Sequence, residues 1–541
     1  MTNKDIARYF NRLGKIMELH NENPFKIRSY TNAYMALRKI DSPLKDYPRE
    51  ELVAIRGIGK TIADKIEELH LTGALSTYQK YEKMTPPGII EMLGIKGFGP
   101  KKIKTIWKQL EIETIGELLY ACNENRLVEL KGFGLKTQAN LKKQLEYFVD
   151  SRGKYHFNNL YAEAEQLNKK LNNKFGNQSA VVGQMIRMMP EVTGIDILSS
   201  IADNVIIDSI SDLSIDEESN KLLYQSYPVT IHTCTEKEFG KLSFIYNSSQ
   251  IFIDSIGIEI PQGKDEKEIF SQLNMAFVHP EYRESELAVS QAKNDTLPNL
   301  ITAQDIKGVV HNHSTYSDGL HSVADMAEQC IQLGYEYLVM SDHSKAAFYA
   351  GGLTEDQVYQ QMEEIDNLNK KYNKFRIFKS IECDILNDGS MDYGNDFIQE
   401  FELVIASIHS NLKMDKQKAT ARLIKAIENP YTHILGHPTG RLLLAREGYP
   451  IDHAYIIDAC AENNMIIELN ANPQRLDLDW TWIPYALEKG VKISINPDAH
   501  SKDQIKYIHA GVCAARKGGL TKEMCLNAMG LDSFSKWIEN L

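Results

Sequence analysis

The sequence predicts a multidomain α+β and α/β protein: a helical N-terminal region, a mixed α/β middle and a C-terminal distorted, seven-stranded β/α barrel. Three observations support this fold class. The 541 residues are enough for about three or four domains of roughly 100–200 residues each. A Gly-x-Gly pattern recurs between helical segments within residues 1–150. From about residue 305, seven apolar runs each end at polar side chains, which is typical of alternating strands and helices.

The composition is that of a soluble globular protein. Hydrophobic residues make up 43% and charged residues 25% of the chain, and no apolar run approaches the ~18 residues that span a bilayer. The N-terminal segment is charged and lacks the apolar stretch of a signal peptide. The seven Cys include no CxxC pair. We therefore expect a cytoplasmic protein with neither a disulfide framework nor a thiolate zinc site.

The charge is divided unevenly along the chain. Residues 1–150 carry 25 Lys and Arg against 19 Asp and Glu, although the whole chain has a net charge of −12. The basic N-terminal region can meet a polyanion. The acidic remainder is either a solvated surface or a place that holds cations, and ten of the fifteen His lie after residue 310.

The N-terminal region repeats one pattern three times, with Gly-x-Gly between two helical segments and a Lys just after it. Two glycines let the backbone approach a ligand closely, and the N–H groups that open the second helix favour an anion. One copy is equally well an ordinary helical hairpin, but three copies indicate contacts with DNA phosphates. The candidate residues are Gly57, Gly59, Lys60, Gly97, Gly99, Lys101, Gly132, Gly134 and Lys136.

These repeats resemble helix-hairpin-helix motifs, which bind the DNA backbone without reading bases. Their order is similar to that of a family X DNA polymerase, with a lyase-like domain at 1–80 and a fingers-like region at 81–150. The resemblance implies that Lys65 is the Schiff-base lysine that removes a sugar phosphate. A solvated lysine on a helix face is the alternative interpretation of Lys65.

Residues 151–300 alternate helical and strand-like stretches, and the family resemblance implies a polymerase palm and thumb. In that family a Gly-Ser turn and two Arg hold the nucleotide triphosphate, and three Asp bind two Mg²⁺ ions. Gly183 and Arg187 match the turn, whereas Gln184 replaces Ser and Ile186 replaces one Arg.

The predicted palm is short of carboxylates. Asp196 matches one family Asp, while Gly194 and Thr230 stand where the other two belong. One carboxylate cannot assemble a two-metal site. We therefore expect a degenerate palm, with Mg²⁺ bound only if the palm is active through substitution by Glu191 or Asp203.

In the C-terminal region the polar groups follow the apolar runs. Catalytic groups of a β/α barrel lie at the carboxyl ends of its strands. His311/His313 and Asp498/His500 each have i, i+2 spacing, which turns both side chains of a pair to one side of a strand. Imidazoles and carboxylates without Cys favour Zn²⁺, Mn²⁺ or Fe. Four other His are assigned to core or surface: His321, His433, His453 and His509.

Residues 305–541 resemble the PHP (polymerase and histidinol phosphatase) phosphoesterase domain, and the whole chain resembles a bacterial family X DNA polymerase with this domain at its C-terminus. The nine matching ligands are His311, His313, Asp318, His343, Glu382, His409, His437, Asp498 and His500. The resemblance implies three divalent metals bridged through Glu382, with Glu382, Asp498 and His343 essential to catalysis. Arg441 and Lys345 are candidates to pair with phosphate oxygens, or else form exposed salt bridges.

The resemblance implies a DNA repair protein whose PHP domain hydrolyses phosphodiesters as a 3′–5′ exonuclease, with weak or lost polymerase activity. Two alternatives stay open: a gap-filling DNA polymerase of base excision repair, and a small-molecule phosphatase of the histidinol phosphatase type. The expected partner is DNA, gapped or with free 3′ ends and bound without sequence preference. Neither a membrane nor an obligatory protein partner is expected.

Overall fold

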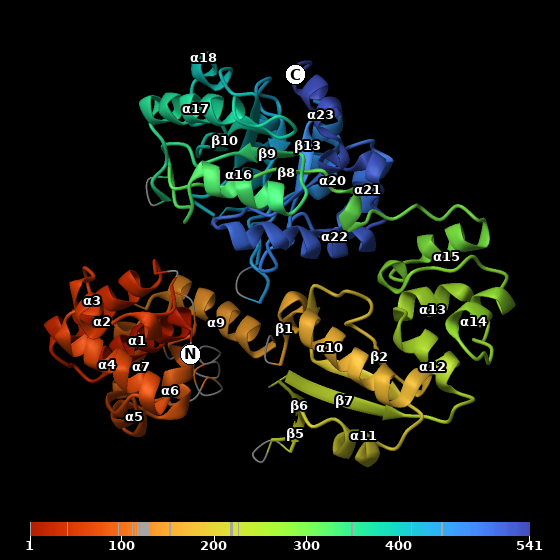
Figure 1. Cartoon of the computed structure of the whole chain (residues 1–541), viewed down its shortest axis with the longest axis horizontal. Coiled ribbons are helices and arrows are strands. Elements are labelled where there is room, and N and C mark those ends of the chain that lie inside the picture. Colours follow the sequence, from red (N-terminus) through yellow and green to blue (C-terminus); the bar gives the residue numbers. More distant parts are fainter. Residues whose placement is uncertain are drawn as a thin grey trace. The chain divides into compact units, whose positions relative to one another are not determined.

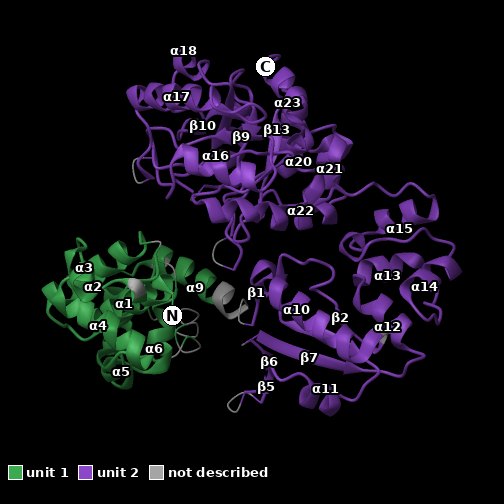
Figure 2. Cartoon of the chain, viewed as in Figure 1, with its two compact units in different colours: residues 1–152 green, residues 153–541 purple. Residues whose placement is uncertain are grey.

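The structure is a computed structural model that divides into two compact units, Met1–Arg152 and Gly153–Leu541 (Figure 2). It describes residues 2–541 apart from 41, 96, 111, 114, 116, 117, 119–126, 128, 129, 131, 132, 151, 152, 217–219, 226, 348, 349, 413, 445 and 446. The predicted DNA-binding residue Gly132 lies outside the described residues. No helix in the part of the chain that the structure describes is long and apolar enough to cross a membrane.

Unit 1 is helical, as predicted (Figure 1). Its α-helices are α1 (Asn3–Leu19), α2 (Pro24–Leu37), α3 (Arg49–Ala54), α4 (Lys60–Thr72), α5 (Ser76–Lys83), α6 (Pro87–Met92), α7 (Pro100–Leu110) and α9 (Leu135–Asp150). In α1 the fully buried Ile6, Phe10, Leu13 and Met17 recur every three or four residues and therefore share one face. They belong to one hydrophobic core that extends from Ile6 to Leu145.

The first part of unit 2 contains a five-stranded mixed sheet, in the region where a palm is predicted. The elements of this part are β1 (Tyr155–His156), α10 (Phe157–Phe175), β2 (Ser179–Val182), β3 (Glu191–Val192), β4 (Ile195–Ser199), α11 (Asp203–Ser209), β5 (Leu213–Ile215), β6 (Leu222–Tyr224) and β7 (Tyr227–Thr233). The strand order is β2-β4-β7-β6-β5, and β4 runs parallel to β7. Leu160 and Leu167 of α10 pack with Ile195 and Ile197 of β4 in one core.

Four short helices follow, in the region where a thumb is predicted: α12 (Phe239–Tyr246), α13 (Gln250–Ile256), α14 (Glu266–Gln272) and α15 (Glu286–Lys293). Their core contains a fully buried arginine. Arg283 donates to Glu266 and to the carbonyl of Val278, at 2.5 and 2.9 Å, and its guanidinium lies 4.9 Å from the centre of the Phe270 ring. Because a buried charge is costly unless it is paired, these contacts keep Arg283 compatible with the core.

The rest of unit 2 alternates strands and helices. Its strands are β8 (Gly308–Val309), β9 (Tyr337–Met340), β10 (Arg376–Asp384), β11 (Leu403–Ser407), β12 (Ile434–Leu435), β13 (Ile466–Asn470) and β14 (Ile493–Asn496). Its α-helices are α16 (Val323–Gln332), α17 (Glu355–Asn369), α18 (Asn395–Ile398), α19 (Lys416–Ile427), α20 (His453–Glu462), α21 (Ile483–Glu488), α22 (Ile508–Lys517) and α23 (Leu531–Ile538).

These seven strands form one parallel sheet in chain order, which nearly closes into a barrel. A parallel bridge between Asn312 and Ala499 joins the two ends of the sheet, with a 2.9 Å bond from the His313 amide to the Ala499 carbonyl. At the opposite end of the strands, Phe534 of α23 stacks on Tyr337 at 4.2 Å and fills the interior. The predicted seven-stranded barrel is confirmed.

The palm, thumb and barrel contact one another within unit 2. Cys513 of α22 belongs to the hydrophobic core of the palm, and Arg516 of α22 donates to Glu281 at 2.7 Å. The four predicted domains, at 1–80, 81–150, 151–300 and 305–541, stay a prediction at that level of detail.

Candidate metal centre

All nine predicted ligands lie in one place, at the carboxyl ends of the barrel strands. His311 and His313 follow β8, His343 follows β9, and Glu382 lies near the end of β10. The remaining ligands come from the segments after β8, β11, β12 and β14: Asp318, His409, His437, Asp498 and His500. Parallel strands bring their carboxyl ends together, so residues almost 190 positions apart meet there.

Glu382 lies at the middle of the cluster. Its Oε1 atom is 3.0 Å from His437 Nε2 and 3.1 Å from His409 Nε2. The same oxygen is 3.2 Å from His311 Nε2, and Oε2 is 2.9 Å from His343 Nδ1. A carboxylate with different imidazoles at its two oxygens has the arrangement expected of a bridging ligand.

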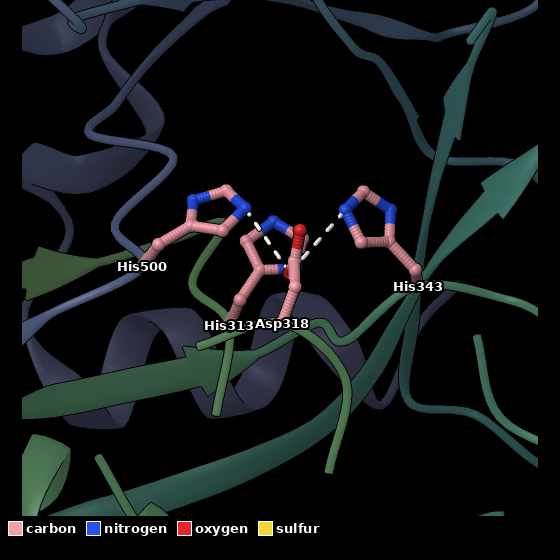
Figure 3. A group of neighbouring side chains, drawn as sticks. All are labelled: His313, Asp318, His343 and His500. Carbon is pink, nitrogen blue, oxygen red and sulfur yellow. Dashed lines mark ion pairs between the residues drawn. The ribbon is translucent and has the colours of Figure 1, made fainter. Parts of the chain in front are cut away.

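Asp318 is the centre of a second group (Figure 3), which lies closer to the surface. Its Oδ1 atom is 3.2 Å from His500 Nε2, 3.7 Å from His343 Nε2 and 4.0 Å from His313 Nδ1. Gly319 lets this loop pass close to the strand, because a Cβ at Gly319 would lie 2.5 Å from the His313 carbonyl oxygen. The loop therefore brings the Asp318 carboxylate against the strand-borne imidazoles.

Buried polar atoms in the cluster are left without hydrogen bonds. They include His311 Nε2, His313 Nδ1, His343 Nδ1 and Glu382 Oε2. Buried polar atoms are almost always satisfied in folded proteins, so four adjacent exceptions call for a ligand. These side chains belong to groups of three or four possible ligands, and within each group the donor atoms lie within 4.8 Å of one another, close enough to share one ion. The residues present thus fit a divalent metal cluster.

The pKa values of the side chains in the cluster depend on their charged neighbours as well as on burial. Burial opposes ionisation of Glu382, but His409 and His311 outweigh it and hold the pKa of Glu382 well below its usual value. Burial likewise opposes protonation of His409, yet Glu382 and Asp384 raise its pKa to about 10. Burial and the neighbouring imidazoles of His500 and His343 lower the pKa of His313 to about 4.

Three of the candidate ligands have positive φ angles, and His437 has the smallest of them, +21°. His311 and Asp498 have φ angles of +65° and +50°, in the left-handed region that residues other than glycine rarely adopt. Such strain collects at functional sites, where the surrounding structure holds it in place. Both residues follow the last hydrogen-bonded position of a strand, and the turn directs their side chains into the cluster.

Carboxylates behind the ligands orient them, and the sequence analysis missed their role. Glu468 Oε2 lies 2.6 Å from His311 Nδ1, and Asp384 Oδ1 lies 2.7 Å from His409 Nδ1. Asp384 also falls within a group of possible ligands with His343 and His409. The sequence did contain a signal for Glu468, because an acidic residue within an apolar strand is expected to be buried and paired. In the structure Glu468 of β13 is fully buried.

The predicted phosphate-binding residues differ in their contacts. The guanidinium of Arg441 is hydrogen-bonded within the protein. It donates to Asp479, to the carbonyl of Leu476 and, at 2.9 Å, to the carbonyl of Arg475. It therefore braces the loop that follows β13. Arg475 of this loop is partly exposed, and its Nε atom is 3.7 Å from Asp498 Oδ2. Lys345 is exposed and pairs with Glu355 at 2.8 Å.

In the palm, Asp196 of β4 and Thr230 of β7 are directly paired, as expected if they occupy two of the family's three Asp positions. The Asp196 carboxylate is 2.9 Å from His232 Nε2. Glu191, one of the two possible substitutes, pairs with Lys154 at 3.4 Å, and the other, Asp203, begins α11. Among the described residues, no group of three possible metal ligands includes Asp196.

The other predicted nucleotide-binding groups of the palm already have protein partners. The Gly183 amide donates to Asn247 of the thumb at 2.9 Å. Arg187 donates twice to Glu284, at 2.9 and 2.7 Å. Lys517 of the barrel helix α22 donates to the same Glu284 and to the Arg187 carbonyl, both at 2.8 Å. A triphosphate role for Arg187 would require this ion cluster to open.

Unit 1 contains the predicted hairpin turns. Gly57 and Gly97 have positive φ angles of 102° and 76°, which only glycine adopts readily, and Gly59 caps α4. Gly99 and Gly134 directly precede α7 and α9. The exposed Lys60, Lys101 and Lys136 lie in the first turns of α4, α7 and α9, which contain no acidic residue. Lys65 of α4 is bonded to Glu68 at 2.5 Å, and its lyase role stays a prediction.

Comparison with known proteins agrees with this geometry. Residues 1–75 match the family described as a helix-hairpin-helix domain, and residues 89–146 match the SAM-like helix-hairpin-helix tandem. Over the full length of both chains, the sequence is 32% identical to the DNA polymerase/3′-5′ exonuclease PolX of Bacillus subtilis (strain 168).

Two further similarities each cover 40% of the chain. A probable phosphatase of Thermoanaerobacter sp. (strain X514) is 25% identical over 40% of this chain and 88% of its own length. The crystal structure of histidinol phosphate phosphatase from Lactococcus lactis, complexed with zinc, L-histidinol and phosphate, matches 40% of this chain and 94% of that one, with 17% identity and a TM-score of 0.30.

Proposed function

The chain belongs to the family of the DNA polymerase/3′-5′ exonuclease PolX, and we propose that it is a metal-dependent exonuclease that removes nucleotides from DNA 3′ ends. One observation carries this proposal: nine imidazole and carboxylate side chains, with Glu382 and Asp318 at the centres of two adjoining groups, meet at the carboxyl ends of the barrel strands. This is the donor set of a multinuclear hydrolytic site, and it contains no thiolate.

Three divalent metals, Zn²⁺, Mn²⁺ or Fe, would be held by three sets of residues. The sets are His311, His313, Glu382 and Asp498; Glu382, His409 and His437; and Asp318, His343 and His500. When bound, such metals supply a hydroxide at neutral pH and neutralise charge on the scissile phosphate. Glu468 and Asp384 fix the ring orientations of His311 and His409, so the donor atoms are in place before any ligand arrives.

Arg475 is the side chain that we assign to the phosphate. It is partly exposed beside Asp498, and a guanidinium can pair with two phosphate oxygens at once. The role predicted for Arg441 becomes that of a brace, because the hydrogen bonds of its guanidinium go to the loop that carries Arg475. The Arg475 guanidinium would thus orient a phosphodiester from the side of Asp498.

DNA is the substrate that the rest of the chain supports. The chain has two helix-hairpin-helix regions, and family members of this kind bind DNA. Backbone amides and Lys60, Lys101 and Lys136 would contact phosphates, which favours gapped DNA and free 3′ ends of any sequence. A small-molecule phosphatase would have no use for these hairpins.

The palm supports no templated synthesis. Asp196 has Thr230 beside it where a second carboxylate is needed, and its own carboxylate is paired with His232. Two metals about 3.5–4 Å apart need several carboxylates to hold them. Asn247 and Glu284 also occupy the groups that would bind a triphosphate. We therefore propose that this palm positions DNA and has lost nucleotidyl transfer.

The test is digestion of a primer–template labelled at either end of the primer, with Mn²⁺ and with or without dNTPs. A 3′–5′ exonuclease shortens the 5′-labelled primer stepwise and releases the 3′ label at once as a mononucleotide. EDTA should stop both the shortening of the primer and the release of the 3′ label. Release of the 5′ label before the 3′ label would show digestion in the 5′–3′ direction. An intact primer under all conditions would overturn the proposal.

A further inference from the structure

Unit 1 contains a cavity of about 810 Å³ that neither the hairpins nor Lys65 lines. It opens between α1, the carboxyl end of α4, and α5. Two kinds of side chain dominate its walls. Four are basic or imidazole groups and two are aromatic rings: Arg8, Arg12, Lys45, His70, Tyr9 and Tyr78.

The aromatic wall is a fixed platform. The rings of Tyr9 and Tyr78 are 4.7 Å apart between centroids and tilted by 57°. Tyr78 is buried, with 5% of its surface exposed, whereas Tyr9 is partly exposed. Both rings line the cavity, and contact with the buried Tyr78 holds the partly exposed Tyr9, which is the more accessible of the two rings. A flat apolar ligand can stack there without first ordering a mobile side chain.

The cationic wall has an excess of basic groups over its two carboxylates, Asp5 and Glu82. Within the described part of the chain, neither Arg12 nor Lys45 forms an ion pair, and Arg8 only approaches Asp5 at 4.0 Å. The Asp5 carboxylate is bound at the start of α1, where it accepts bonds from the amide and hydroxyl of Thr2 at 2.9 and 2.6 Å. Glu82 is the second carboxylate in the wall. Burial and the nearby Lys45 lower the pKa of His70, as expected beside an excess of positive charge.

A ligand that satisfies both walls has a planar base and more than one phosphate. In double-stranded DNA the faces of the bases are stacked on one another, so a ring such as Tyr9 cannot reach them. In a single strand each base can turn onto an aromatic ring while the flanking phosphates contact Arg or Lys. Resting on the proposed function, we propose that this cavity binds single-stranded DNA, with one base on Tyr9 and the adjacent phosphates on Arg8, Arg12 and Lys45.

The test measures DNA binding by fluorescence anisotropy with the full-length chain carrying His343→Ala. The DNA is a 20-nucleotide single strand or its blunt duplex, both with phosphorothioate 3′ ends. Tyr9→Ala and Arg12→Ala should each weaken single-strand binding by about tenfold and leave duplex binding within about twofold. Glu82→Gln should strengthen single-strand binding, because it removes the opposing carboxylate. Lys83→Ala is the matched control, since Lys83 is exposed on the same helix α5 and does not line the cavity.

Two outcomes would overturn the proposal. One is unchanged single-strand affinity in Tyr9→Ala and Arg12→Ala with normal circular dichroism. The other is an equal loss of affinity for single-stranded and duplex DNA, which would show that the cavity is part of a general basic surface. Hydrolysis of thymidine 5′-(p-nitrophenyl) phosphate by the unmutated chain is measured separately. If that hydrolysis fails, the proposed barrel activity is wrong while the single-strand result stands on its own.

Discussion

Glu468 and His311 form a fully buried pair behind the metal centre, with 2.6 Å between Oε2 and Nδ1. Glu468 also accepts bonds from the side-chain amides of Asn470 and Asn496, at 2.9 and 2.8 Å. This network leaves His311 Nε2 directed at Glu382 and Asp498. The orientation of a ligand at one strand thus depends on a carboxylate from a strand far along the chain.

Glu468→Gln should lower metal affinity by about 10–100-fold, because the amide no longer holds His311 in place as a charged carboxylate does. Exonuclease activity should fall at low Mn²⁺ and return at high Mn²⁺. Titration of activity against Mn²⁺ concentration measures the shift. A loss that added metal never restores would instead indicate a structural role.

His343→Ala and Asp498→Ala should each reduce exonuclease activity by at least about 100-fold while the chain stays folded. Both side chains lie in the ligand cluster, so their loss removes a metal ligand and leaves the hydrophobic core intact. Primer digestion and circular dichroism give the two measurements. His453→Ala is the control, because His453 stacks on Trp482 outside the centre. Undiminished digestion by both variants would contradict the assignment.

Primer extension should be absent on a gapped template with Mg²⁺ or Mn²⁺. The assay uses the His343→Ala chain, in which digestion cannot mask synthesis. Asp196 is the family carboxylate that this palm keeps, and His232 is bonded to it. Lengthening that depends on dNTPs and disappears on Asp196→Ala would show that the palm is active and that its carboxylates were aligned wrongly.

Replacing Lys60, Lys101 and Lys136 together with Ala should flatten the salt dependence of duplex binding. Each lost phosphate contact removes about 0.9 from the slope of log affinity against log salt. A charge-matched control replaces Lys39, Lys80 and Lys83, which are exposed and lie outside the three turns. Equal slopes for the two triple variants would mean that the Gly-x-Gly segments are ordinary turns.

Lys517 should make the stability of unit 2 depend on pH. Burial lowers its pKa to about 8, below the ordinary value of 10.5. Between these values the folded chain binds fewer protons than the unfolded chain, so its free energy of unfolding should rise with pH relative to Lys517→Met. The rise is at most about 1.4 kcal/mol per pH unit, and below pH 8 the difference should be flat.

Urea unfolding between pH 7 and 10, followed by tryptophan fluorescence, compares the two chains. Trp480 is a suitable probe because the Lys517 ammonium lies 4.9 Å from its ring. A stability difference that falls as pH rises would show that the Glu284 pair, and not burial, controls Lys517.

The sequence by itself determined the barrel and the common location of its nine candidate ligands. Each ligand directly follows an apolar run or lies a few residues beyond one, and parallel strands place such positions at one end of the sheet. The hairpin turns were equally predictable, because Gly-x-Gly and the following Lys are neighbours in the chain. In both cases each functional residue lies close in sequence to the strand or turn that positions it, and this short spacing determines which way its side chain faces.

Only the tertiary structure decided which distant side chains pair. Glu468 is 157 residues from His311, and Lys517 is 330 residues from the Arg187 carbonyl that it binds. No spacing encodes such contacts, because they depend on which strands become neighbours and how α22 packs against the palm and thumb. The contacts of Arg441 and Arg475 also depend on the folded loop after β13. Both residues lie near strand ends, and the loop accepts the hydrogen bonds of Arg441 while it leaves Arg475 partly exposed beside Asp498.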